Sequence, residues 1–89
     1  MAWSIQFSSG ARRQLEKLDP QVARRIFQFV FERIAPSSNP RSLGEALKST
    51  ELGSLWRYRV GDYRILGSIE DRDVRILVVA VGNRREIYR

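Results

Sequence analysis

The segment that most restricts the fold of this chain is Leu-Trp-Arg-Tyr-Arg-Val-Gly-Asp-Tyr-Arg at residues 55–64. Side chains of a β-strand point alternately to opposite faces of the sheet. The aromatic residues at alternate positions therefore share one face of a predicted strand, and Arg57 and Arg59 share the other. The Gly-Asp pair that follows favours a turn. The sequence thus predicts a hairpin with aromatic side chains buried on one face and guanidinium groups on the opposite face.

Further strands are predicted on both sides of this hairpin. Residues 63–70 form its second strand, and the acidic stretch at residues 70–73 is typical of a turn. Residues 74–81 are almost continuously apolar and rich in β-branched residues, which indicates a central strand that ends at Gly82-Asn83. Short connections favour antiparallel neighbours, so these strands form a meander. Residues 2–7 alternate and predict a half-buried first strand.

Two helices are predicted between the first strand and the hairpin. Ser8 or Ser9 is a suitable N-cap for the first helix, and Asp19-Pro20 separates it from the second. Apolar residues at helical spacing predict a second helix of about four turns. They are Val22, Ala23, Ile26, Phe27, Phe29, Val30 and Ile34. Residues 41–53 are expected to be an irregular or weakly helical connection.

The predicted order is β-α-α-β-β-β in a single domain spanning residues 1–89. This is an α+β fold with a four-stranded, mainly antiparallel sheet. Two helices cover only one face of such a sheet. The other face stays open, and Arg57 and Arg59 are expected to lie there.

The composition favours an anionic partner. The formal charge is +6, with fourteen arginines against two lysines, and a small basic chain most often meets nucleic acid or an acidic protein. Arginine binds phosphate in a bidentate way, although genomic codon bias also favours arginine over lysine. The chain has no Cys and no His, which excludes zinc sites built from them and imidazole catalysis.

No apolar run is long enough to span a bilayer, and the N-terminal residues do not resemble a signal peptide. A cytoplasmic protein without membrane contact is therefore expected.

Cations from three strands converge at one end of the predicted meander. Arg57 and Arg59 come from the first strand, Arg64 from the second, and Arg84 follows the third. Neighbouring strands lie about 4.8 Å apart, so these side chains can reach one phosphate. The alternative is a set of unrelated, solvated surface arginines. No metal site is expected among the carboxylates, because they fall in predicted turns.

The strand order, the hairpin motif and the ending Val-Gly-Asn-Arg-Arg-Glu-Ile-Tyr resemble the RelE-type toxins of the RelE/ParE superfamily, from type II toxin–antitoxin modules. The resemblance covers the whole chain. It implies a ribosome-dependent, metal-independent endoribonuclease without a cofactor. The 2′-hydroxyl of the mRNA attacks the adjacent phosphate, leaving a 2′,3′-cyclic phosphate and a 5′-hydroxyl. It also implies an acidic, partly disordered, RelB-like antitoxin, and contact with operator DNA only through that antitoxin.

The resemblance also implies roles for individual residues. Arg64 stabilises charge on the phosphorane, Arg84 serves the leaving group, and Tyr88 orients the nucleotide. The expected catalytic residues are Arg59, Arg64, Arg84 and Tyr88. The residues expected to contact the substrate are Arg57, Asn83 and Arg85.

The chain departs from the family pattern at two places. Arg57 and Arg59 stand where the type member has lysines, and an arginine cannot accept a proton as a general base. Asn83 stands where many relatives have His. A ParE-like gyrase inhibitor and an inactive, antitoxin-binding fold are the alternatives. Arg64, Arg84 and Tyr88 favour the nuclease.

Overall fold

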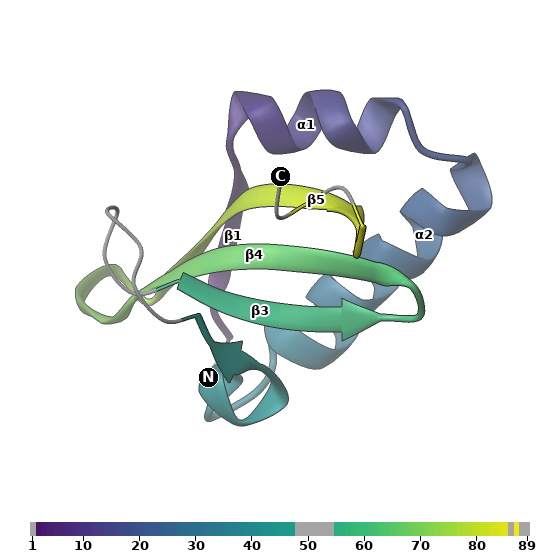
Figure 1. The fold of residues 1–89 in the computed structure, drawn as a ribbon. Coiled ribbons are helices and arrows are strands. Elements are labelled where there is room, and N and C mark those ends of the chain that lie inside the picture. Colours follow the sequence, from purple (N-terminus) through teal and green to yellow (C-terminus); the bar gives the residue numbers. More distant parts are fainter. Residues whose placement is uncertain (1, 48–54, 86, 88–89) are drawn as a thin grey trace.

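The computed structural model describes residues 2–47, 55–85 and 87, and its sheet has the strand order β1-β5-β4-β3-β2 (Figure 1). β3 (Leu55–Val60), β4 (Tyr63–Glu70) and β5 (Arg75–Asn83) form the predicted antiparallel meander. β1 (Ser4–Phe7) pairs with β5 in parallel. The α+β class and the mainly antiparallel sheet are confirmed.

The expected count of four strands is wrong, because a short fifth strand lies at the edge of the sheet. β2 (Glu45–Ala46) pairs with β3 in antiparallel orientation, with Glu45 opposite Arg57. It follows a 3₁₀ turn at Pro40–Leu43. This part of the predicted irregular connection is therefore ordered against the sheet, while residues 48–53 of that prediction lie outside the described residues.

Both helices begin where the sequence predicts. α1 (Ser9–Glu16) is capped by Ser8, and α2 (Pro20–Phe29) is capped by Asp19. α2 continues directly into a π-helical turn at Val30–Ile34, which completes the predicted second helix. No helix in the described part of the chain is long and apolar enough to cross a membrane.

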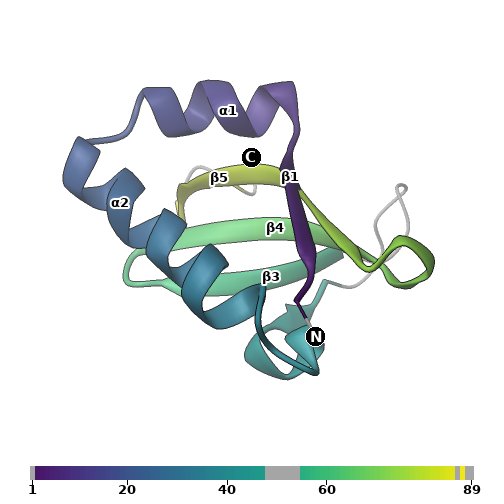
Figure 2. The same cartoon turned by 180° about the vertical axis from the view of Figure 1, so that it is seen from behind.

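The helices and one face of the sheet enclose a single core. Figure 2, seen from behind, shows α2 running across the sheet and α1 along β5. The buried residues of this core are Ala11, Leu15, Ile26, Val30, Ile34, Tyr58, Ile65, Ile76, Val78 and Val81. Neither α1 nor α2 lies over the opposite face, as the sequence predicts for the part of the chain that the structure describes.

The β3–β4 turn has the expected Gly-Asp pair. Gly61 has φ +60°, whereas the φ of Asp62 is not positive. A positive φ at the first turn residue alone is the pattern of a type II′ turn, which favours glycine at that position. This turn sets the register in which Arg59 lies directly opposite Arg64.

β5 is longer than predicted. The expected break at Gly82-Asn83 is wrong, because both residues still pair with β4: Gly82 lies opposite Arg64, and Asn83 opposite Tyr63. The strand can continue because its partner β4 extends to the turn. The extension places Arg84 beside the β3–β4 turn.

Candidate functional site

The face of the sheet opposite the helices carries Arg57, Arg59 and Arg64, and we call it the basic face. Tyr58, between two of these arginines, is 1% exposed and lies in the core. Alternation along β3 then directs its two arginine neighbours away from the core. The side chain of Arg59 is 62% exposed and that of Arg57 is 23% exposed. The predicted placement of both residues on the open face is confirmed.

Arg64 is held against the β3–β4 turn by hydrogen bonds. Its Nη1 donates to the carbonyl oxygens of Gly61 and Tyr63, each at 2.9 Å. A guanidinium has five N–H donors, so these bonds orient the side chain while leaving donors for a ligand. Arg64 is therefore a pre-oriented cation beside Arg59.

Arg84 reaches the same turn through its backbone. Its N–H donates to the carbonyl oxygen of Asp62 at 2.9 Å, and its side chain is exposed. Arg59, Arg64 and Arg84 thus gather at one end of the sheet from three consecutive strands, as the sequence predicts.

Arg84, Arg85 and Ile87 form a local turn beside Asn83. The side-chain oxygen of Asn83 accepts the N–H of Arg85 at 3.0 Å, and its carbonyl oxygen accepts the N–H of Ile87 at 3.0 Å. Asn83 thus shapes the tail, and the substrate contacts expected of Asn83 and Arg85 stay predictions. Tyr88 lies outside the described residues.

A carboxylate that the sequence analysis did not single out lies among these arginines. Glu45 forms an ion pair with Arg57 through Oε2, and its Oε1 lies 3.9 Å from Nη2 of Arg59. The hydrogen bond from Arg57, followed by the charges of Arg57, Arg59 and Arg64, lowers the pKa of Glu45. The sequence offers no periodic signal for Glu45, because its strand has only two residues.

A hollow of about 270 Å³ lies beside this carboxylate, and we call it the Glu45 pocket. Its lining residues are Ser42, Leu43, Gly44, Glu45, Arg57 and Arg59. One acid and two guanidinium groups therefore line the same opening, which suits an anion that also carries an acidic proton.

Two contacts hold residues 40–46, which include Glu45, against β3. The hydroxyl of Tyr58 donates to the carbonyl oxygen of Pro40 at 2.9 Å, and burial raises the pKa of Tyr58 to about 12. A Cβ on Gly44 would lie 2.6 Å from the carbonyl oxygen of Arg57, so only glycine permits this approach of the two backbones. Glu45 is thus positioned by β3 itself.

Arg25 is a second residue whose location the sequence did not indicate. A Cβ on Gly61 would lie 3.4 Å from Nη2 of Arg25, so this α2 side chain lies beside the β3–β4 turn. Its helix neighbour Arg24 is also exposed, and the three atoms nearest to a Cβ on Gly61 all belong to Arg25. Arg25 adds positive charge to the end of the sheet where Arg59, Arg64 and Arg84 gather.

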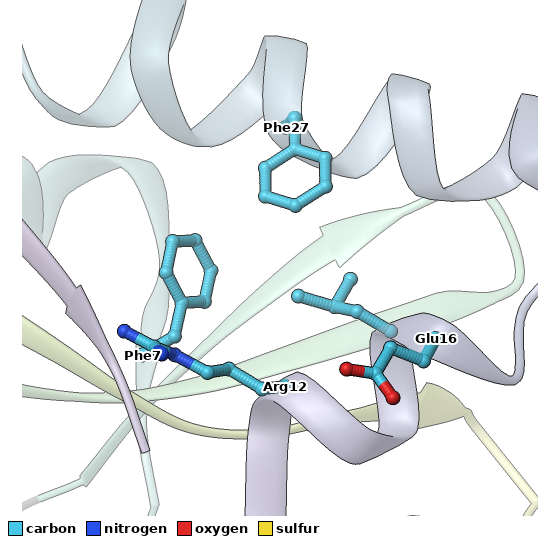
Figure 3. Close-up of a pocket in the computed structure, with 5 residues that line it drawn as sticks. Phe7, Arg12, Glu16 and Phe27 are labelled. Atoms are coloured by element: carbon cyan, nitrogen blue, oxygen red, sulfur yellow. The ribbon is translucent and has the colours of Figure 1, made fainter. Parts of the chain in front are cut away.

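A different surface lies on the helix side of the molecule. Phe7, Arg12, Leu15, Glu16 and Phe27 line a hollow of about 350 Å³ between β1, α1 and α2 (Figure 3). Phe7 and Phe27 meet edge to face at 5.6 Å, and Phe31 stacks on Phe27 at 6.3 Å. Phe27 is 39% exposed because the core-facing stripe of the helix is formed by Ile26, Val30 and Ile34. Phe27 therefore lies at the edge of the apolar face of the helix rather than in the core.

The fold and the site together define a small α+β protein with arginines gathered on the open face of its sheet. Comparison with known proteins identifies its family. The model of the family described as the ParE toxin of type II toxin–antitoxin systems matches residues 5–88. Toxin RelG of Mycobacterium tuberculosis is 33% identical over 89 residues, covering 100% of this chain and 99% of the relative.

Toxin RelE of the same organism is 30% identical over 87 residues, covering 98% of this chain and 87% of the relative. The solved toxin–antitoxin complex RelBE2 of M. tuberculosis matches with a TM-score of 0.83 and 28% identity, covering 97% of this chain and 95% of the matched chain. This chain belongs to the RelE/ParE superfamily and is a toxin of the type II toxin–antitoxin class.

Proposed function

We propose that this toxin is a ribosome-dependent endoribonuclease that cuts translated mRNA in the cytoplasm without using a metal ion. The substrate 2′-hydroxyl attacks the adjacent phosphate, and the products are a 2′,3′-cyclic phosphate and a 5′-hydroxyl. The observation that carries this proposal is the meeting of Arg59, Arg64 and Arg84 at the β3–β4 turn. Fixed cations at one point stabilise the charge that develops on a phosphate during transfer.

Each arginine has a separate role in the proposal. Arg57 and Arg59 bind the scissile phosphate from β3, and Arg64 stabilises the pentavalent phosphorane. Arg84 donates a hydrogen bond to the departing 5′-oxygen, because a guanidinium is a good donor but a very weak acid. Tyr88 fixes the attacking nucleotide, and Asn83 and Arg85 contact the RNA.

The proposed protein partner is an acidic, partly disordered antitoxin similar to RelB. The solved relative RelBE2 is a toxin–antitoxin complex, and the charge of +6 on this chain favours fast association with an acidic segment. Such a segment can wrap a large surface as it folds. We propose that it closes the basic face, and that operator DNA is reached only through the antitoxin.

Single-turnover cleavage on saturating ribosome–mRNA complexes tests the nuclease. Arg64→Ala or Arg84→Ala removes a charge partner of the transition state, which commonly costs about 3–4 kcal/mol, or roughly 100- to 1000-fold in rate. Arg13→Ala, on the exposed side of α1, is the matched control and is expected to cleave at the wild-type rate. Equal rates for all four proteins contradict the assignment.

A gyrase inhibitor is the second candidate, because the family whose model matches this chain is described as the ParE toxin. A DNA supercoiling assay with purified gyrase separates the two activities. Inhibition of gyrase together with intact ribosome-bound mRNA favours this second function over the nuclease.

A further inference from the structure

We propose that Arg25 of α2 binds a second phosphate of the mRNA, the one that follows the cleaved phosphate on its 3′ side. This inference rests on the proposed nuclease function and adds a substrate contact outside the sheet. Arg25 is a positioning residue in this proposal, because it holds the RNA beyond the β3–β4 turn and does not touch the reacting atoms.

Gly61 brings the guanidinium groups of Arg25 and Arg64 to the same turn. Nη1 of Arg64 donates to the carbonyl oxygen of Gly61 at 2.9 Å. A Cβ on Gly61 would lie 3.4 Å from Nη2 of Arg25, 3.9 Å from its Nη1 and 4.0 Å from its Cζ. These three atoms belong to the guanidinium group, so the charged end of Arg25 lies on the turn. The two cations therefore approach one residue, from α2 and from β4.

The positive charge at this turn is not balanced by an ion pair. The ion pairs between described residues include neither Arg25 nor Asp62, the acid of the turn itself, and they include neither Arg64 nor Arg84. Like charges gathered at one place repel each other, and a bound anion relieves that repulsion. Arg25 is exposed, and its planar guanidinium suits bidentate contact with a phosphate.

The proposed course of the RNA explains which phosphate reaches Arg25. The departing 5′-oxygen belongs to the nucleotide on the 3′ side of the cleaved bond, and it is assigned to Arg84. The backbone N–H of Arg84 donates to the carbonyl oxygen of Asp62, so this nucleotide lies at the β3–β4 turn. Figures 1 and 2 both show the turn beside α2. The next phosphate of the strand, beyond the turn, therefore meets Arg25.

A phosphate contact of this kind fixes the position of the RNA without reading its sequence. Its loss is expected to weaken productive binding and to change the rate at saturation much less. Arg24 provides the matched control, because it is also exposed on α2, whereas the atoms nearest to a Cβ on Gly61 belong to Arg25.

The test uses single-turnover cleavage of model mRNAs in ribosome complexes by wild type, Arg25→Ala, Arg25→Lys, Arg24→Ala and Arg64→Ala. Each mRNA is unmodified or carries one methylphosphonate, which has no negative charge, at the phosphate on the 3′ or the 5′ side of the cleaved one. The measured quantities are the toxin concentration that gives half the maximal rate and the rate at saturation.

On unmodified mRNA, Arg25→Ala is expected to need about 10- to 100-fold more toxin for half the maximal rate, as for loss of a charge-assisted hydrogen bond. Arg25→Lys is expected to be intermediate, and Arg24→Ala equal to wild type. The 3′ methylphosphonate is expected to weaken wild type by a similar factor and to have little further effect on Arg25→Ala.

Additive effects of Arg25→Ala and the 3′ methylphosphonate overturn the inference and assign Arg25 to another anion, such as a phosphate of ribosomal RNA. Non-additive effects at the 5′ side alone contradict the proposed course of the RNA. Equal losses in Arg24→Ala and Arg25→Ala reduce the effect to overall charge and also contradict a specific contact. In each of these cases slow cleavage by Arg64→Ala leaves the nuclease standing, whereas a wild type that does not cleave removes both proposals.

Discussion

Arg41 and Arg75 differ from the arginines of the basic face in what they contact. Arg41 donates to both carboxylate oxygens of Asp71, at 2.9 and 2.7 Å, and Arg75 binds Glu70 at 2.5 Å. These pairs lie at the β4–β5 connection, away from the β3–β4 turn, and they tie loops to the sheet. The arginines of this chain therefore form two groups, those of the basic face and those that tie loops to the sheet. Their positions in the structure distinguish the two groups, whereas the composition does not.

Arg25 and Arg24 allow a matched test of this distinction, because both are exposed on α2 and the atoms nearest to a Cβ on Gly61 belong to Arg25. We expect Arg25→Ala to weaken RNA binding. The slope of the logarithm of the binding constant against the logarithm of the salt concentration is expected to decrease by about one unit, as for loss of one phosphate contact. Arg24→Ala is expected to leave the slope unchanged. RNA-binding titrations at several salt concentrations measure this slope. Identical slopes for the two variants exclude a role for Arg25 at the turn.

Tyr58 provides a test of the core beneath the site. Its folded-state pKa, about 12, lies above the ordinary value of 10.0, so the unfolded chain loses this proton first as the pH rises. The stabilisation of the folded state by the protonated Tyr58 hydroxyl is complete below pH 10. It decreases between about pH 10 and 12, by roughly 2–3 kcal/mol in total. Tyr58→Phe has no hydroxyl proton and loses the hydrogen bond to the carbonyl oxygen of Pro40. We expect this loss to lower the free energy of unfolding by about 1–2 kcal/mol near neutral pH.

Urea unfolding of both proteins from pH 8 to 12 measures this effect. The advantage of wild type over Tyr58→Phe is expected to shrink as the pH rises. A constant difference across that range contradicts burial of the hydroxyl.

At the scale of elements, the 40–46 segment decides where the edge of the sheet lies. Gly44→Ala places a Cβ 2.6 Å from the Arg57 carbonyl oxygen and forces β2 away from β3. Such overpacking costs about 1–3 kcal/mol, and we expect cleavage to fall because the strand that carries Arg57 is displaced as well. Both the free energy of unfolding and the single-turnover rate report the change.

Gly10→Ala is the control for this variant. The added Cβ in α1 meets only the Ser8 hydroxyl oxygen at 3.9 Å, an ordinary contact. Alanine is favoured over glycine within a helix by roughly 0.5–1 kcal/mol, so this variant is expected to be slightly more stable and equally active. Equal effects of the two substitutions contradict the close approach at Gly44.

The elements that could be predicted from the sequence are those with a periodic signal or a strong cap. Alternation around Tyr58 predicted β3, and Asp19-Pro20 predicted the start of α2. β2 could not be predicted, because two residues show no period and its position depends on a glycine contact with a distant strand. The arginines of the candidate site followed from strand parity, but Glu45 did not, because its place depends on that same contact.

At the scale of the whole molecule, pairing of β1 with β5 closes the fold. Ser4 lies opposite Arg75 and Phe7 opposite Val78, so the first strand has its partner about seventy residues later. Long-range pairing of this kind slows folding, because a large loop must close before the contacts form.

A chain that stops after residue 73 is therefore expected to remain unfolded. It lacks β5, which contacts β1, β4 and α1 and supplies three residues of the core. Amide NMR spectra with poor dispersion, together with rapid proteolysis, are the expected result. A well-dispersed spectrum from this shortened chain contradicts the central role of β5.

The parallel pairing of β1 with β5 also has a consequence for the order of events during synthesis. A chain is made from its N-terminus, so β1, both helices and the arginines of β3 emerge before the strand that closes the sheet exists. Arg84 comes after β5, and therefore the cluster at the β3–β4 turn is assembled last. A protein whose proposed target is translation thus acquires its charge cluster only after β5 has been synthesised. Until then, the ribosome that makes it carries a chain in which the three arginines are not yet together.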